Sequence, residues 1–320
     1  MFATASNLDR LVSNENPGIA ILGATASGKT RLAMALALRF KGEIVSCDAL
    51  QVYRHMNIGT AKIPPAGREG ILHHMLDVQD PGQDFSAGDY QRMAREAIRE
   101  IHKCGHIPFV VGGTGFYLRA LIDGLFEGPA RSEELRARMR NIIRRKGSRI
   151  LHHALKRIDS QSAARIAETD AERIIRAYEI FLVSQKPMSW WQQQPRDAFR
   201  GYRWLKIGID VPREQLYQRI NQRVEEMFQA GFLEEVRGLL ERFPRSSHAF
   251  KAIGYRQIAE HLDGQLSLEQ AVEETKKQSR HYAKRQLTWF RADPSILWLD
   301  GRLDPNELQI RAAALIAEFL

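Results

Sequence analysis

The sequence Gly18-Ile-Ala-Ile-Leu-Gly23-Ala-Thr-Ala-Ser-Gly28-Lys29-Thr30 decides the fold of this chain. Its apolar first part predicts a buried strand, and Gly23–Thr30 fits the pattern G-x-x-x-x-G-K-[ST]. The residues from Thr30 to Phe40 predict a helix directly after this loop. Between a strand and a helix, the glycines let backbone N–H groups curl around phosphate oxygens, and the N-terminus of the helix adds a favourable dipole. The stretch therefore predicts a loop that binds a phosphorylated ligand, without saying which ligand.

Two side chains of this phosphate loop have chemistry of their own. Lys29 would neutralise a phosphate charge, and the hydroxyl of Thr30 would bind Mg²⁺. The candidate ligand-binding residues are Gly23, Ala24, Thr25, Ala26, Ser27, Gly28, Lys29 and Thr30.

Further strands and helices alternate around the loop. The sequence predicts strands over 43–48, 106–112, 204–210 and 296–300, and helices over 85–104, with Ser86 as the N-cap, and from about Phe116. This alternation predicts an α/β fold with a parallel sheet flanked by helices. Residues 129–200 show only helical patterns. We therefore expect an α/β core made of residues 17–128 and 201–320, interrupted by an all-helical insertion domain over 129–200.

Most of the excess positive charge falls within this insertion. The chain of 320 residues has a net charge of +9, and residues 129–200 hold 16 Lys and Arg against 8 Asp and Glu. Such a segment attracts polyanions, nucleic acid above all, although a solvated helical face rich in arginine is an equally good interpretation from charge alone. Its place in the middle of the chain favours a docking surface.

Composition excludes several other classes of protein. The chain has only two cysteines, Cys47 and Cys104, too few for a disulfide scaffold or a cysteine-based zinc finger. There is no apolar run of the length that a membrane span needs, and no secretory signal is recognisable. We expect a cytoplasmic protein without a membrane partner.

Two further positions follow predicted strands at the edge of the sheet where ligands bind. Asp48 ends the second strand, where its carboxylate suits a metal's second shell or a general base, and capping of the next turn is the weaker interpretation. Thr114, in the turn Gly112-Gly-Thr-Gly115, could donate to a phosphate or leaving-group oxygen. From this motif alone, a plain tight turn before a helix is the preferred interpretation.

Seven motifs together resemble the tRNA dimethylallyltransferases, also called tRNA isopentenyltransferases. The resemblance covers about residues 17–300, in the order of the family, and it is to the bacterial type because the zinc finger of eukaryotic members is absent. It implies a P-loop NTPase-like core. The matching stretches are Gly23–Thr30, Asp48–Arg54 with Ile58–Lys62, His73–Asp77, Val111–Tyr117, Arg173–Glu179, Gly254–Arg256 and Tyr282–Arg291.

The resemblance implies a reaction and a set of catalytic residues. A dimethylallyl group would pass from dimethylallyl diphosphate to the exocyclic amine of the adenine directly 3′ of the anticodon in tRNA, releasing diphosphate. Asp48 matches the family's general base, and Thr114 matches the threonine on the oxygen that bridges the diphosphate and the prenyl carbon. Arg223 matches an arginine at the diphosphate site through a looser alignment. Mg²⁺ would be the cofactor, bound by Thr30.

The resemblance also implies the contacts with tRNA. The basic insertion would clamp the anticodon stem, with Arg173 and Arg176 in its contact stretch. In the core, one stretch would meet the flipped base and two others would line the RNA groove, although for Trp289 in the last stretch we expect burial in the core. The core residues expected to contact tRNA are Asp48, Ala49, Leu50, Gln51, Lys251, Gly254, Tyr255, Arg256, Lys284, Arg285, Gln286 and Arg291.

Three alternatives remain open from the sequence. A prenyltransferase of the cytokinin type would act on free adenosine phosphates and would not need the basic insertion. An RNA-binding ATPase or a small-molecule kinase would use the loop for ATP. A non-catalytic RNA-binding protein would keep the loop as a relic. We expect a monomer, and a structural role for His73 and His74, with one imidazole donating to the backbone.

Overall fold

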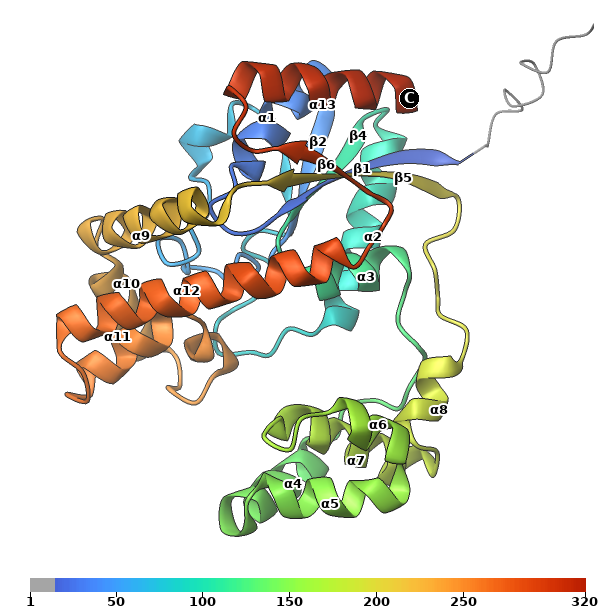
Figure 1. The fold of residues 1–320 in the computed structure, drawn as a ribbon, viewed down its shortest axis with the longest axis vertical. Helices are drawn as coiled ribbons and strands as arrows, with labels where there is room; N and C mark the ends of the chain where they lie inside the picture. The colour runs from blue at the N-terminus through green and yellow to red at the C-terminus, as the bar shows by residue number, and fades with distance from the viewer. Residues whose placement is uncertain (1–14) are drawn as a thin grey trace, which may run out of the picture. The chain divides into compact units, whose positions relative to one another are not determined.

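The structure is a computed structural model that describes residues 15–320. Its contacts divide the chain into two compact units (Figure 1). One comprises the described residues up to Ile122 together with Phe199–Leu320, and the other comprises Asp123–Ala198. The helical unit therefore begins and ends a few residues before the bounds expected from sequence. The shift arises because an antiparallel bridge between Phe126 and Arg196 closes this unit at its base.

Six parallel strands form a single sheet in the first unit, in the order β3-β2-β4-β1-β5-β6. The predicted parallel sheet is confirmed. The sequence did not reveal β3, because two histidines offer no apolar run. The strands are β1 (Asn16–Gly23), β2 (Gly42–Cys47), β3 (His73–His74), β4 (Ile107–Gly112), β5 (Tyr202–Asp210) and β6 (Ile296–Asp300).

Helices accompany these strands in the first unit. The predicted N-cap of α2 is confirmed: Ser86 accepts from the backbone N–H of Asp89, and the Asp89 carboxylate accepts from the backbone N–H of Ser86. The helices are α1 (Lys29–Arg39), α2 (Ala87–Lys103), α3 (Gly115–Ile122), α9 (Arg213–Gln229), α10 (Phe232–Arg242), α11 (Tyr255–Leu262), α12 (Leu268–Arg291) and α13 (Pro305–Phe319).

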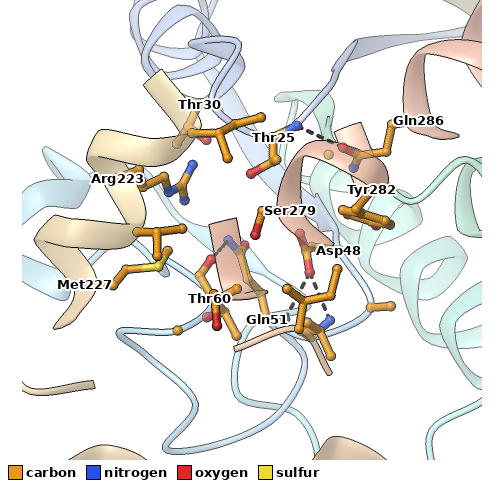
Figure 2. Close-up of a pocket in the computed structure, with 18 of the residues that line it drawn as sticks. Thr25, Thr30, Asp48, Gln51, Thr60, Arg223, Met227, Ser279, Tyr282 and Gln286 are labelled. Carbon is orange, nitrogen blue, oxygen red and sulfur yellow. Dashed lines mark hydrogen bonds between the residues drawn. The ribbon is translucent and has the colours of Figure 1, made fainter. Parts of the chain in front are cut away.

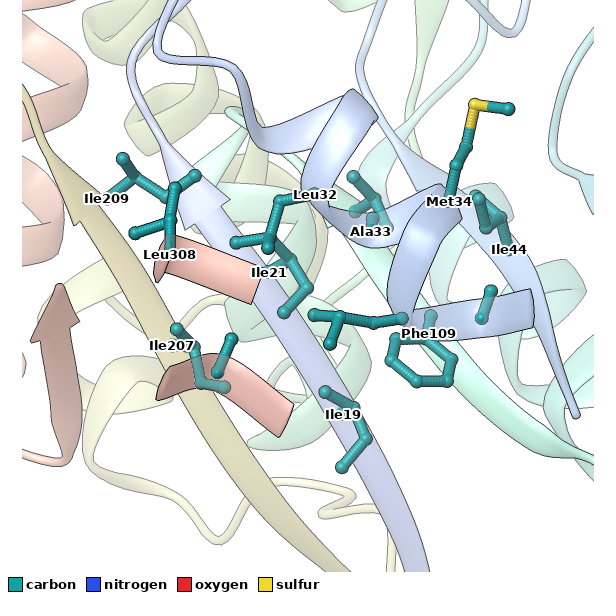
Figure 3. Close-up of a cluster of buried hydrophobic side chains, with 14 of the residues drawn as sticks. Ile19, Ile21, Leu32, Ala33, Met34, Ile44, Phe109, Ile207, Ile209 and Leu308 are labelled. Carbon is teal, nitrogen blue, oxygen red and sulfur yellow. The ribbon is translucent and has the colours of Figure 1, made fainter. Parts of the chain in front are cut away.

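Both faces of the sheet are buried, as a parallel sheet requires. Alternate residues of β1 point to opposite faces: Ile19 and Ile21 pack under α1 and α13 (Figure 3), whereas Ala20 and Leu22 pack against α2 and α3. All four side chains are fully buried. The apolar run quoted at the start is therefore the centre of two cores, which holds the phosphate loop at a rigid strand end.

The second unit is a bundle of short helices with a core of its own. Leu155, Ile174 and Ile180 are fully buried in it. Glu179 is buried as well, and its carboxylate accepts from Arg176 at 2.6 Å and from Arg136 at 3.1 Å. The helices are α4 (Glu133–Lys146), α5 (Ser148–Ile158), α6 (Ser160–Arg165), α7 (Ala171–Ser184) and α8 (Met188–Gln193).

Among residues 15–320, no helix is both long and apolar enough to cross a membrane.

A buried carboxylate joins three strands at one side of the sheet. Glu43 on β2 accepts from His74 Nε2 on β3 and from His106 Nδ1 just before β4, each at 2.6 Å. Burial alone would raise the pKa of Glu43, but the bonds from His106 and His74 outweigh it and hold that pKa below its ordinary value. His73 Nδ1 donates to the carbonyl of Ile71 at 2.9 Å. These histidines thus have structural contacts.

We predict that Glu43→Gln lowers the free energy of unfolding at neutral pH by about 1–3 kcal/mol, the cost of a disrupted buried hydrogen-bond pair. Because the pKa of Glu43 is lower in the folded state, its stabilisation is present above the ordinary glutamate value and is lost as the pH falls through the folded value. Urea unfolding at a series of pH values should therefore show the gap between wild type and variant closing in acid. Exposed Glu318→Gln is the control, and a gap that stays constant with pH contradicts the prediction.

Candidate active site

Three loops that carry predicted site residues follow adjacent strands. β1 leads into the phosphate loop, β2 into Asp48, and β4 into the turn Gly113–Gly115. Since β2, β4 and β1 are neighbours and parallel, their carboxyl ends lie at the same edge of the sheet. A pocket opens there, and the helices α9 and α12 close its other sides (Figure 2).

The phosphate loop has the backbone shape that its glycines allow. Gly28 adopts φ 92° as the N-cap of α1, in the left-handed region that glycine enters at little cost. The N–H of Ser27 donates to the carbonyl of Ala24 at 3.2 Å, and Lys29 Nζ donates to the same carbonyl at 3.2 Å. The lysine is thereby held beside the loop, with Thr25 and Thr30 in the same pocket lining.

Two half-buried cations line this pocket. Lys29 comes from α1, and Arg223, labelled in Figure 2, comes from α9. Burial, and then the charge of Arg223, lowers the pKa of Lys29 to about 8, while Asp48 opposes the shift; burial also lowers the pKa of Arg223. Within residues 15–320 neither cation has an ion-pair partner within 4 Å. Two neighbouring cations without such partners favour an anionic ligand.

Asp48 lies on the pocket wall with one oxygen engaged. Its Oδ1 accepts the backbone N–H of Leu50 at 2.9 Å and that of Gln51 at 3.3 Å. Asp48 thus caps the turn that follows it, which was the weaker of the interpretations of this residue from sequence. Both bonds use the same oxygen, so Oδ2 is left for a substrate. Ala49, Leu50 and Gln51 line the pocket beside it.

Thr114 is hydrogen-bonded to the backbone of the residue that follows Asp48. Its Oγ1 accepts the backbone N–H of Ala49 at 3.1 Å, so the hydroxyl proton remains to be donated elsewhere. The turn itself needs glycine, because a Cβ on Gly112 would lie 2.0 Å from the carbonyl oxygen of Cys47. The turn after β4 therefore packs closely against the end of β2.

One face of α12 forms a wall of the pocket. Thr275, Ser279, Tyr282 and Gln286 recur every three or four residues, which places them on a single side of the helix. Burial, and then the negative charge of Asp48, raises the pKa of Tyr282 to about 12, so its hydroxyl stays protonated. Ser279 was not among the residues predicted from the sequence. The helical spacing from Tyr282 back to Thr275 is the signal that could have found it.

Thr60 also lines the pocket, and most of the remaining lining is apolar and comes largely from α9. Ile220, Val224 and Met227 follow helical spacing around Arg223, and Val111 and Ile253 add to the surface. Arg223 was the only residue of this helix predicted to lie in the site. The apolar residues could not be recognised as pocket residues, since the same spacing is also typical of a helix packed on an ordinary core.

Several residues predicted to contact tRNA are buried. Gly254 is buried, and Tyr255 lies in a core cluster, where its hydroxyl donates to Glu235 at 2.6 Å. Gln286 is 5% exposed and is bonded to backbone on two sides. These three residues are not part of the exposed surface, and their contact with tRNA stays a prediction. Trp289 is the opposite case: it is 41% exposed, against the expectation of a core position.

The charged residues of that prediction do reach the surface. Lys251, Lys284 and Arg285 are exposed, and Arg256 and Arg291 are exposed in ion pairs with neighbouring carboxylates. In the helical unit, Arg173 is exposed beside Asp170, whereas Arg176 is committed to Glu179 and to the carbonyl of Pro129. Arg176 thus contributes first to the structure of its own unit.

Comparison with known proteins identifies the family. The family model described as IPP transferase matches residues 51–293. A tRNA dimethylallyltransferase from Koribacter versatilis is 50% identical over 88% of this chain and 92% of its own length. The crystal structure of a tRNA isopentenylpyrophosphate transferase from Bacillus halodurans has a TM-score of 0.71, with 38% identity over 95% of this chain and 96% of that one.

A more distant solved structure extends the comparison. A eukaryotic dimethylallyltransferase, described as acting on tRNA, has a TM-score of 0.73 and 28% identity, over 89% of this chain and 74% of that one. The match to the family model covers most of the chain, and the first relatives match nearly end to end. The chain belongs to the tRNA dimethylallyltransferase family of prenyl-group transferases.

Proposed function

We propose that this protein transfers a dimethylallyl group from dimethylallyl diphosphate to the exocyclic amine of the adenine directly 3′ of the anticodon in tRNA. The observation that carries the proposal is the pocket whose lining brings Asp48 together with two half-buried cations, Lys29 and Arg223. A phosphate loop, a carboxylate and an apolar wall in one pocket match the three parts of the reaction: diphosphate, amine and prenyl chain. Membership of the family supports the same assignment.

The polar side of the pocket would hold the diphosphate. Lys29 and Arg223 would neutralise it, and the loop N–H groups would bind its oxygens. As the carbon–oxygen bond breaks, negative charge grows on the leaving diphosphate. The Thr114 hydroxyl would donate a hydrogen bond to the bridging oxygen and keep its proton, since its Oγ1 already accepts from the N–H of Ala49. The apolar residues of α9 would contact the dimethylallyl chain.

Asp48 would act on the acceptor amine. The lone pair of an adenine amine is delocalised into the ring, so the amine is a weak nucleophile. As the nitrogen–carbon bond forms, the amine proton would pass to Asp48 Oδ2, while Oδ1 stays bonded to the N–H groups of Leu50 and Gln51. The backbone therefore fixes the direction of the base. Extrusion of the adenine from the loop stack costs a few kcal/mol, to be offset by contacts with the protein.

The donor set fits Mg²⁺ bound mainly through the substrate. Over residues 15–320, no group of three or more His, Cys, Asp or Glu is placed to hold a metal. Mg²⁺ commonly takes one or two protein oxygens and completes its shell with phosphate oxygens and water. The Thr30 hydroxyl, in the same lining as Lys29, would supply a protein ligand. When bound, the ion would stabilise charge on the diphosphate.

The helical unit would clamp the anticodon stem as the RNA-binding part of a monomeric, cytoplasmic enzyme. Its exposed arginines on α4, such as Arg144 and Arg145, supply cations for phosphate contacts.

The relatives described above carry tRNA-acting names, so the cytokinin-type and ATPase alternatives have no support from them. Label transfer from dimethylallyl diphosphate to an anticodon stem-loop, but not to AMP or ADP, tests the proposal. Label in the free nucleotides, or in no acceptor, overturns it.

In that assay, Asp48→Asn should lower the rate of transfer by ~100-fold or more, the scale of a lost general base, and should leave stem-loop affinity nearly unchanged. Asparagine keeps an Oδ1 acceptor for the backbone bonds, so the turn is preserved. The control is Asp80→Asn, which makes the same chemical change at an exposed residue paired with Arg54. A silent Asp48→Asn would mean that another group takes the proton.

Binding of inorganic diphosphate with Mg²⁺ should weaken as the pH rises through about 8, because the ammonium of Lys29 then loses its proton in the free protein. Calorimetry in buffers of different ionisation enthalpy should detect proton uptake on binding in this range. Lys29→Arg, which stays charged, reports the diphosphate's own titration and should show no such uptake by the protein. Equal uptake in both proteins would contradict the prediction.

Reversal of two insertion charges, Arg144→Glu with Arg145→Glu, should weaken stem-loop binding and flatten its salt dependence. Each lost phosphate contact removes roughly 0.7–0.9 from the slope of log K against log salt concentration. The matched control reverses two exposed arginines of the first unit, Arg302 and Arg311, which pair with carboxylates of their own. Equal effects of the two double variants would return this face to a solvated surface.

A further inference from the structure

Gln286 lies at the junction of three elements that the proposed reaction uses. It belongs to the inner face of α12, and its side chain is almost fully buried. Its Oε1 accepts the backbone N–H of Thr25 in the phosphate loop at 2.9 Å, shown as a dashed line in Figure 2. Its Nε2 donates to the carbonyl of Gly113 at 2.9 Å. One amide therefore bridges the phosphate loop and the turn that carries Thr114.

The turn after β4 is shaped to receive α12. A Cβ on Gly113 would lie 2.1 Å from Gln286 Nε2, and a Cβ on Gly115 would lie 2.1 Å from the ring of Trp289. Two glycines that flank Thr114 thus let the helix approach the backbone of the turn. This close approach explains the burial of Gln286.

We infer that Gln286 is a positioning residue that sets the geometry between the diphosphate and the groups at the reacting bond. The inference rests on the proposed function. The bridge occupies the N–H of Thr25, which fixes the curl of the loop, and it fixes Gly113, which is followed directly by Thr114. Through Ala49, whose N–H binds Thr114, the bridge reaches the segment of Asp48. A displacement of about 1 Å between such groups costs on the order of 100-fold in rate.

Glutamine suits this position better than amino acids of similar size and better than its charged counterpart. The bridge needs an acceptor and a donor on one neutral side chain. Glutamate has no donor for the carbonyl of Gly113 and would add negative charge beside the diphosphate. Methionine fills a similar volume without either bond. Asparagine is one methylene shorter, so it would not span the two contacts.

The test separates a positioning role from RNA contact by measuring the two steps independently. Single-turnover prenyl transfer with both substrates saturating reports the chemical step, and anisotropy of a labelled anticodon stem-loop reports affinity. Gln286→Met should lower the saturated rate by ~10–100-fold and leave the dissociation constant of the stem-loop within about 2-fold. This substitution should also weaken the binding of inorganic diphosphate with Mg²⁺. The control, Gln265→Met, makes the same chemical change at an exposed residue before α12 and should change none of these values.

Each other outcome overturns part of the account. A weaker stem-loop affinity at an unchanged saturated rate would make Gln286 an RNA-contact residue, and unchanged values for both would make the bridge dispensable. If Gln286→Met does not fold, Gln286→Glu keeps the bond to Thr25 and is expected to show a smaller loss of rate when the pH is lowered toward protonation of the carboxyl. A pH-independent loss contradicts the bridge. If wild type itself transfers no label, the proposed function fails instead.

Discussion

The pocket is built around two half-buried cations that have no ion-pair partner of their own among residues 15–320. Lys29 and Arg223 share one pocket, and burial lowers the pKa of each. Charges in this state are unfavourable until an anion arrives. The fold tolerates them because the phosphate loop is held by β1, whose side chains lie at the centre of the cores on both faces of the sheet. The stability of the sheet thus offsets the strain of the pocket.

The helix α12 connects this pocket to the surface. Its inner face carries the hydroxyls of Ser279 and Tyr282 and the amide of Gln286, and its outer face carries exposed Lys284 and Arg285. A capping box formed by the side chains of Ser267 and Gln270 fixes where the helix starts. Because the helix is continuous, the register of the inner residues determines where the outer cations lie. The proposed RNA-binding and diphosphate-binding residues of α12 therefore share one continuous helix.

The sequence was sufficient for those parts of the structure that depend on local pattern. The phosphate loop, the alternation of strands and helices, and the position of Asp48 at a strand end follow from spacing and turn chemistry. Sequence did not distinguish the two faces of α12, since Gln286 and Lys284 are both polar and only tertiary packing buries one of them. The prediction that Trp289 is buried was wrong for the complementary reason: its ring packs on Gly115, which leaves it at the surface. The two-residue β3 carries no signal of its own.

The helical unit leaves the sheet and returns to it through neighbouring points. The N–H of Phe199 donates to the carbonyl of Ile122 at 2.9 Å, and the bridge between Phe126 and Arg196 follows directly. A Cβ on Gly124 would lie 2.0 Å from the carbonyl oxygen of Asp197, so the two connections touch there. The entropy of closing the chain between α3 and β5 grows only slowly with its length, and the two ends already meet at this junction. The helical unit can therefore be lengthened or reshaped at small cost without disturbing the pairing of β1 with β5.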